Sequence, residues 1–282
     1  MVKKKVNKRK PVKIKSNKNI KPEKKSKKSM PIGVIILLII MGIIIVGLIG
    51  FTIGVTSSNI FKDVFVFEVG SGNIISETRD VSYFNNVELQ YMGNIYITQG
   101  ETNSFTIEAE DNIIPWLTTT IKDNKLIISR DRSKIGWINN TKPINMYITM
   151  KDISSLKING SGDIISESLI TSDDLKLTIN GSGDITVETN TNNLETRING
   201  SGSAFLIGEA TNHIFNISGS GDLTAVELLT ENTNISISGS GDAKVNASTK
   251  LDVKISGSGD ISYIGNPEVS KTISGSGSVR QI

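Results

Sequence analysis

The chain has 282 residues, with 31 basic and 28 acidic side chains and a formal net charge of +3 at pH 7. It contains no cysteine, which excludes a domain held together by disulfides. Its single histidine, His213, has no partners for a His-based metal site or a catalytic triad, so we interpret it as an ordinary wall residue of the fold.

Residues 1–31 form a lysine-rich arm. Its first 30 residues hold fourteen Lys and Arg, one acid, Glu23, and almost nothing apolar. Such a segment cannot bury enough surface to fold, so we predict that it is disordered. It lacks the interleaved aromatic side chains of a nucleic-acid-binding segment, so nucleic acid is not an expected partner.

Residues 32–55 carry no charge and consist mostly of Ile, Leu, Val and Gly. A helix of this length would reach about 36 Å, enough to cross a hydrocarbon core of about 30 Å. A cleavable signal peptide has a shorter apolar run and a small-residue cleavage site, so we predict a transmembrane helix. The lysine arm then stays in the cytoplasm, which predicts a single-pass protein of the cell membrane with an extracellular C-terminal domain.

Residues 56–68 are predicted to be a linker and first strand, and residues 69–150 an irregular, aromatic-rich part of a β-helix. The segments "VGSGNIISETRD" from Val69 and "YMGNIYITQG" from Tyr91 predict two early coils, and "DNKLIISRD" and "INMYITM" predict further strands. The aromatic side chains gather in this part, which predicts a bulky end that closes the solenoid.

A polar loop over residues 131–143 interrupts these strands and carries Trp137. A tryptophan in such a loop is a candidate binding residue that stacks on a sugar ring or inserts into a partner. The alternative is that it folds back over an exposed end of the solenoid, because a sheet edge needs cover.

Residues 151–282 repeat one phrase, from "INGSGDI" at Ile158 to "ISGSGSV" at Ile273. The first glycines of the seven copies are separated by 21, 19, 19, 20, 18 and 18 residues, the length of one coil of a β-solenoid. We therefore predict an all-β fold. It is a parallel, right-handed β-helix of about 19–20 residues per coil and about ten coils, preceded by the transmembrane helix and the disordered arm.

Two columns of the phrase have predicted structural roles. The isoleucine before each Asn or Ser predicts an interior ladder of stacked side chains: Ile158, Ile179, Ile198, Ile217, Ile237, Ile255 and Ile273. The Gly-Ser-Gly that follows predicts a sharp corner, because glycine adopts positive φ at little cost. The turn glycines are Gly160, Gly162, Gly181, Gly183, Gly200, Gly202, Gly219, Gly221, Gly239, Gly241, Gly257, Gly259, Gly275 and Gly277.

An aspartate ends five of the seven phrases: Asp163, Asp184, Asp222, Asp242 and Asp260. Three interpretations compete. The first is a turn residue that bonds nearby backbone amides. The second is a Ca²⁺ site, although one carboxylate per coil supplies few of the six to eight oxygens that Ca²⁺ takes. The third is a carboxylate pair that cleaves sugars.

The chain also resembles a known family. The stretch "SETRDVSYFNNVEL", the following "GNIYITQGETNSFTIEAEDNIIPWLTT" and the recurring "INGSGD" are together similar to the putative autotransporter adhesin family with a head GIN domain, over nearly all of residues 69–282. The resemblance implies an envelope-exposed, β-helical, non-enzymatic domain. It supplies no catalytic or binding residues to carry over.

We therefore expect a membrane-anchored, externally displayed binding or structural module, adhesin-like and not an enzyme, with no cofactor, no catalytic residue and no metal. The expected partners are the bilayer and a cell-wall or glycan surface or another protein, and the open ends of a solenoid would permit a homo-oligomer. Two alternatives stay open: an extracellular enzyme that acts on polysaccharide, and a membrane-anchored envelope sensor.

Overall fold

The computed structural model describes residues 66–134 and 136–282, which lie in a compact unit assigned to Ile60–Ile282. The predicted basic arm and membrane span lie outside the described residues. Within those described ranges, no helix is long and apolar enough to span a membrane. Helical structure there is confined to one 3₁₀ turn, η1 (Ile114–Trp116), so the described fold is all-β.

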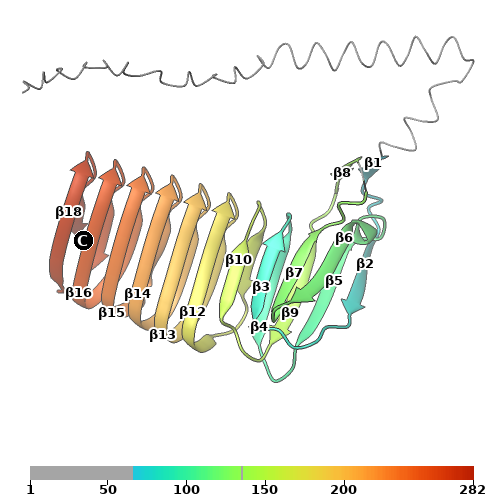
Figure 1. The fold of residues 1–282 in the computed structure, drawn as a ribbon, viewed down its shortest axis with the longest axis horizontal. Coiled ribbons are helices and arrows are strands. Elements are labelled where there is room, and N and C mark those ends of the chain that lie inside the picture. Colours follow the sequence, from blue (N-terminus) through green and yellow to red (C-terminus); the bar gives the residue numbers. More distant parts are fainter. Residues whose placement is uncertain (1–65, 135) are drawn as a thin grey trace, which may run out of the picture. The chain divides into compact units, whose positions relative to one another are not determined.

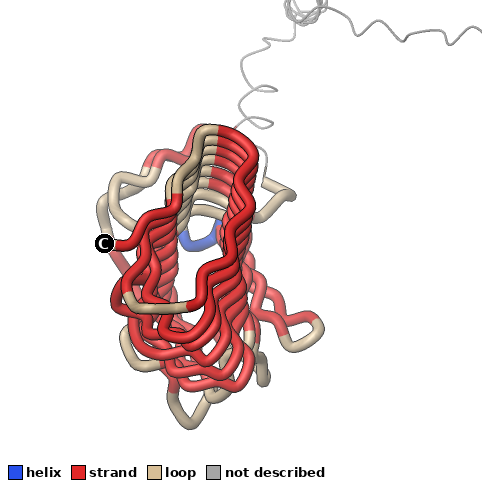
Figure 2. Tube along the Cα trace, turned by 90° about the vertical axis from the view of Figure 1, so that its left-hand side faces the viewer, coloured by secondary structure: helices blue, strands red, loops and turns tan. Residues whose placement is uncertain are grey.

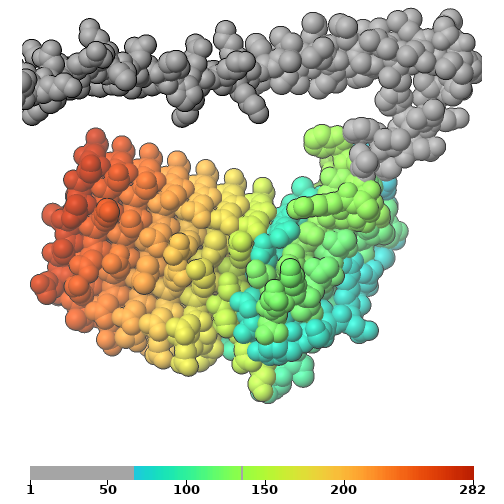
Figure 3. Space-filling model, in the orientation of Figure 1, coloured from blue at the N-terminus to red at the C-terminus, as the bar shows by residue number. Residues whose placement is uncertain are grey.

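The regular part of the fold is a parallel β-solenoid of about seven turns. Each turn repeats nearly the same outline when the stack is viewed from its end (Figure 2), and the coils lie side by side as successive ridges (Figures 1 and 3). Its strands are β10 (Ser155–Ile158), β11 (Asp163–Ser166), β12 (Ile170–Gly181), β13 (Ile185–Gly200), β14 (Ala204–Gly219), β15 (Leu223–Gly239), β16 (Ala243–Gly257), β17 (Ile261–Ile264), β18 (Glu268–Gly275) and β19 (Val279–Gln281).

The parallel pairing places equivalent residues of successive phrases opposite one another. Ile179 pairs with Ile198, which pairs with Ile217, and the same register continues to the last coil. The isoleucines from Ile158 to Ile255 are at most 1% exposed, whereas Ile273, in the last coil, is 38% exposed. Burying one such side chain stabilises the fold by about 1.5–3 kcal/mol, so this column is a principal source of stability.

The upstream residues do not wind in chain order, and the expectation of about ten coils was therefore wrong. Strands β3 (Asn86–Gln90) and β4 (Asn94–Gln99) pair in parallel with β10 and β11. Strands β7 (Lys125–Arg130) and β9 (Asn145–Met150) pair in parallel with the other edges of β3 and β4. Residues 86–99 are thus held between two segments that both follow them in sequence.

Antiparallel strands cover this end of the stack. β5 (Ser104–Glu110) pairs antiparallel with β9 and with β2 (Ile74–Arg79), and β6 (Leu117–Lys122) pairs antiparallel with β7. β1 (Val66–Val69) and β8 (Gly136–Asn139) form a separate two-stranded parallel ribbon. The hydrophobic core nevertheless runs without interruption from Phe84 to Ile261.

The predicted coil that starts at Val69 is absent from this arrangement, because β2 runs antiparallel to β5 instead of stacking on another corner. The buried Glu110 binds the turn of this segment. Its carboxylate accepts hydrogen bonds from the Gly72 amide (2.8 Å) and from the amide and hydroxyl of Thr141 (2.9 and 2.5 Å). Burial raises the pKa of the Glu110 carboxyl, but these hydrogen bonds outweigh it and hold the pKa below its ordinary value.

Candidate functional site

The glycines at the corners allow successive coils to pack closely against each other. Gly200 has a φ of +144°, which L side chains rarely adopt, and a Cβ there would overlap the carbonyl oxygen of Gly181 in the preceding coil. A Cβ on Gly202 would overlap the Gly183 carbonyl oxygen and lie 2.9 Å from Cγ2 of Ile179. The two glycines of a corner therefore allow successive coils to approach closely enough for the isoleucines behind them to stack.

The asparagines of the phrase form a chain of amide hydrogen bonds between coils. Asn199 Nδ2 donates to Asn180 Oδ1 (2.8 Å), and Asn180 Nδ2 donates to Asn159 Oδ1 (2.6 Å). Asn159 donates in turn to the buried carboxylate of Glu88 (2.5 Å). Burial raises the pKa of the Glu88 carboxyl, but hydrogen bonds from Gln90 and Lys125 outweigh burial, and the pKa stays below its ordinary value.

A second amide ladder was missed at the sequence level. Asn193 Nδ2 donates to Asp174 Oδ1 (2.9 Å), Asn212 to Asn193 (3.0 Å), and Asn232 to Asn212 (3.1 Å). The available signal was the spacing of these residues, which matches the spacing of the corner glycines. Stacked amides of this kind hold neighbouring coils in register.

The five corner aspartates also bond from coil to coil. Each carboxylate accepts a hydrogen bond from the backbone N–H of the equivalent residue one coil later, at 2.7–2.9 Å, as with Asp242 and the amide of Asp260. In the described part of the chain, no group of three or more His, Asp or Glu lies close enough together to hold a metal ion. The carboxylates thus bond backbone amides, as the turn interpretation supposed, but in the next coil instead of their own.

His213 is a wall residue whose ring points inward. It lies in register between Leu194 and Thr233 and is 1% exposed. Nε2 lies 3.1 Å from the Thr196 hydroxyl, and Nδ1 has no hydrogen-bond partner. Burial lowers the pKa of His213 to about 4, so the ring is neutral at physiological pH.

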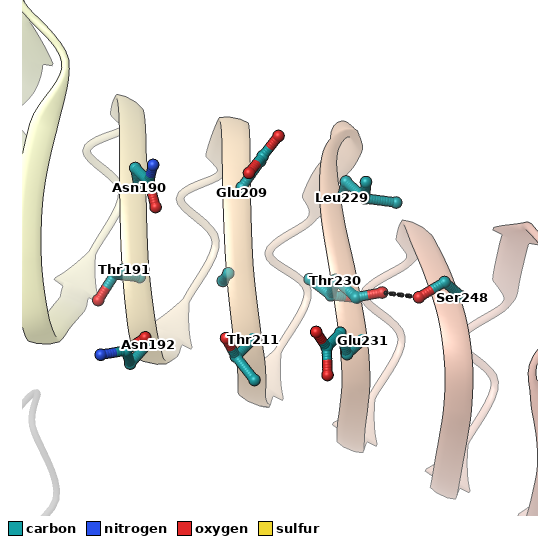
Figure 4. A pocket seen from close by; sticks show the side chains of 10 residues that line it. Asn190, Thr191, Asn192, Glu209, Thr211, Leu229, Thr230, Glu231 and Ser248 are labelled. Atoms are coloured by element: carbon teal, nitrogen blue, oxygen red, sulfur yellow. Dashed lines mark hydrogen bonds between the residues drawn. The ribbon is translucent and has the colours of Figure 1, made fainter.

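A polar groove crosses the coils on one side of the solenoid (Figure 4). Its volume is about 290 Å³, and an adjoining hollow of about 440 Å³ shares three residues with it, Asn190 to Asn192. The groove is lined by Asn190, Thr191, Asn192, Glu209, Ala210, Thr211, Leu229, Thr230, Glu231 and Ser248. Two carboxylates and no basic side chain line it, so it is electronegative and suits a ligand that donates hydrogen bonds.

The groove lies where the repeat is broken. Ala210 pairs with Thr191 on one side and Thr230 on the other, so a small side chain stands where both neighbouring coils carry threonine. The next coil is irregular as well, because the pairing of β15 with β16 shifts register after Ala225. The side chains of Thr191, Ala210 and Thr230 are themselves 2–4% exposed, so the exposed residues on either side of them and the shifted strand bound the hollow.

Trp137 lies on β8 in the two-stranded ribbon, opposite Phe67 of β1. Its side chain is 70% exposed and that of Phe67 is 68% exposed. Trp137 therefore does not fold back over the end of the solenoid. The tryptophan that packs inside this end is Trp116, which is 5% exposed and lies beneath Arg130 and Lys134, each 5.3 Å from the ring centroid.

Three solved structures with this fold are similar to the chain, two of them described as putative adhesins and one as a putative lipid binding protein. A putative adhesin from Bacteroides fragilis is 29% identical, with a TM-score of 0.71 over 76% of this chain and 99% of that chain. A putative lipid binding protein from Parabacteroides distasonis, 23% identical, has a TM-score of 0.66 over 77% of this chain and 100% of that chain. A putative adhesin from Parabacteroides merdae, also 23% identical, has a TM-score of 0.63 over 76% of this chain and 98% of that chain.

No curated protein matches the sequence. The family model described as "Putative auto-transporter adhesin, head GIN domain" matches residues 83–267, which confirms the resemblance found in the sequence. The chain belongs to this family of putative auto-transporter adhesins.

Proposed function

We propose that the protein is a membrane-anchored, externally displayed binding module, adhesin-like and non-catalytic. The adhesin family supports display at a cell surface. The proposed anchor is the uncharged segment 32–55, with the lysine arm before it on the cytoplasmic side. The β-solenoid then provides a long, rigid surface whose polar rows face outward, the kind of surface that solenoid proteins use for binding.

The groove around Ala210 is the proposed binding site, because it is the place where the regular rows give way to a hollow. Its exposed asparagine and serine side chains and the half-exposed Thr211 donate and accept hydrogen bonds, while Glu209 and Glu231 accept only. The hydroxyls of the buried Thr191 and Thr230 already donate to backbone carbonyls. An anionic polymer would meet like charge there. The ligand class that fits is a neutral or amine-bearing saccharide, with hydroxyl or amino groups that donate to the two carboxylates.

A non-catalytic role is supported by the state of the corner aspartates. The enzyme alternative required a pair of carboxylic groups with one acting as acid and the other as base or nucleophile. Each corner carboxylate instead accepts a backbone N–H of the next coil, which gives it a structural partner.

The test is a glycan and cell-wall binding array run beside a reducing-sugar assay, with the double variant Glu209→Gln, Glu231→Gln as the decisive comparison. Both side chains are exposed and line the groove, so the amides should leave the fold intact while they remove the negative charge that the ligand's donors meet. We expect retention of a neutral or amine-bearing glycan by the natural protein, loss of retention in the variant, and no released sugar. Glu188→Gln, which removes an exposed carboxylate outside the groove lining, should bind normally. Release of reducing sugar would support the enzyme alternative, and equal binding by the double variant would place the ligand elsewhere.

A further inference from the structure

We propose that one face of the β1–β8 ribbon, formed by Phe67, Val69 and Trp137 and called here the aromatic face, docks onto the headgroup region of the lipid bilayer. The inference rests on the membrane anchor of the proposed function and assigns the outer domain a second, peripheral contact with the same membrane. It concerns a different surface from the groove, since no residue of the ribbon lines the groove and the ribbon is a separate sheet.

The aromatic face is an unusual concentration of exposed apolar side chains. Phe67 and Trp137 are opposite partners in the parallel pairing and are 68% and 70% exposed, and Val69 is 47% exposed. The alternate residue Ile138 points the other way and packs against the hydrophobic core. The ribbon therefore has one face committed to the domain and the other turned outward with its largest side chains.

The ribbon is held in place on the domain. Asn112 Nδ2 donates to the Val69 carbonyl (2.7 Å) and to the Glu68 carboxylate (2.5 Å). The Gly70 amide donates to the Asn139 carbonyl (2.9 Å), which continues the ladder beyond the strand. These bonds hold β1 on Asn112 and join β1 to β8, and Ile138 of β8 packs against the core, so the outward direction of Phe67 and Trp137 is built into the fold.

The bilayer is the proposed partner of the aromatic face, because the proposed anchor limits how far this face can lie from the membrane. The predicted span ends at Val55, twelve positions before Phe67, so even a fully extended connection keeps the aromatic face within about 42 Å of the membrane surface. Tryptophan and other amphipathic aromatic side chains are favoured at the headgroup level.

Membrane contact at the ribbon would leave the rest of the solenoid available. The ribbon lies at the end of the domain opposite to β18 (Figure 1), and the groove lies on β13 to β16. A second contact beside the anchor would restrict the rotation of the domain and so present the groove in a limited range of orientations.

The two tryptophans of the chain allow a direct test. In the full-length Trp116→Phe variant, reconstituted in lipid nanodiscs, Trp137 is the sole tryptophan. We expect its emission to move to shorter wavelength when compared with the unfolded chain, and to lose most of its intensity when the nanodisc lipids carry a quencher just below the headgroup. Trp137→Phe, which leaves the buried Trp116, is the matched control and should not be quenched.

The outcomes separate this inference from the anchor on which it rests. Co-elution of the chain with the nanodisc reports the anchor, and loss of co-elution would overturn the anchor and the inference together. A chain that co-elutes while Trp137 keeps a water-like, unquenched emission would refute the docking alone. An emission that is shifted but unquenched by the lipid would mean that protein covers the aromatic face, such as a second copy, and would also refute it.

Discussion

Acidification from pH 8 to pH 5 should destabilise the solenoid through His213. The ring is sealed in the interior between coils, with Nδ1 unpaired and Nε2 beside the Thr196 hydroxyl. In the fold its pKa is about 4, against an ordinary value of 6.5 in the unfolded chain. The unfolded chain therefore binds more protons between these two values, so folding stability is full above pH 6.5 and falls as the pH drops toward 4.

The size of the effect follows from this difference in pKa. At pH 5 the unfolded chain is almost fully protonated at this site and the folded chain is almost unprotonated, which costs about 2 kcal/mol of stability relative to pH 8. Below pH 4 the loss from this site levels off at about 3 kcal/mol. The pKa values of Glu88 and Glu110 lie below their ordinary values, so the stability that these carboxylates contribute is lost only at more acidic pH. Between pH 8 and pH 5 we therefore expect His213 to account for the change in stability.

Urea denaturation of the natural protein and of His213→Leu at pH 8, 6 and 5 provides the measurement. Leucine occupies the equivalent position in Leu194, so the variant keeps an apolar side chain in the column. The natural protein should lose about 2 kcal/mol between pH 8 and 5, and the variant only a small fraction of that. Equal losses in the two proteins would show that His213 is not the group that titrates.

Three further predictions concern the phrase itself. Ile217→Asp should lose more than about 4 kcal/mol, since it removes a buried side chain and leaves an unpaired charge. Ile214→Asp, on the same strand but 51% exposed, should change stability by less than about 1 kcal/mol, and similar losses in both would argue against the ladder. Gly202→Ala should lower the free energy of unfolding by about 1–3 kcal/mol in a urea titration, because its Cβ overlaps the preceding coil. Ser201→Ala is the control and should be nearly neutral. A neutral Gly202→Ala would refute the argument that the coils are closely packed at this corner. Millimolar Ca²⁺ should leave the thermal midpoint unchanged, and a rise of several degrees would reinstate the aspartates as ligands.

The sequence alone determined the regular half of the fold. Each repeat contacts the repeats next to it, so the residues that meet in space are those that recur at one period along the chain. The isoleucine column, the glycine corners and the coil length could therefore be predicted from spacing, and the motifs upstream were enough to identify the family. The coil-to-coil bonds of the aspartates required coordinates, because an aspartate before a strand is compatible with several partners.

The tertiary structure decided the remainder, where contacts join residues that no period relates. Strands β3 and β4, in residues 86–99, pair with β7 and β9 on one edge and with β10 and β11 on the other. No local sequence pattern encodes which edge each of these later segments takes. The antiparallel pairing of β2 with β5 and the hydrogen bond from the Gly72 amide to the Glu110 carboxylate are non-local in the same way. The hollow at Ala210 and the exposed pair of Phe67 and Trp137 likewise arise only when neighbouring strands are brought together, since exposure and free volume belong to the packed chain and not to any single residue.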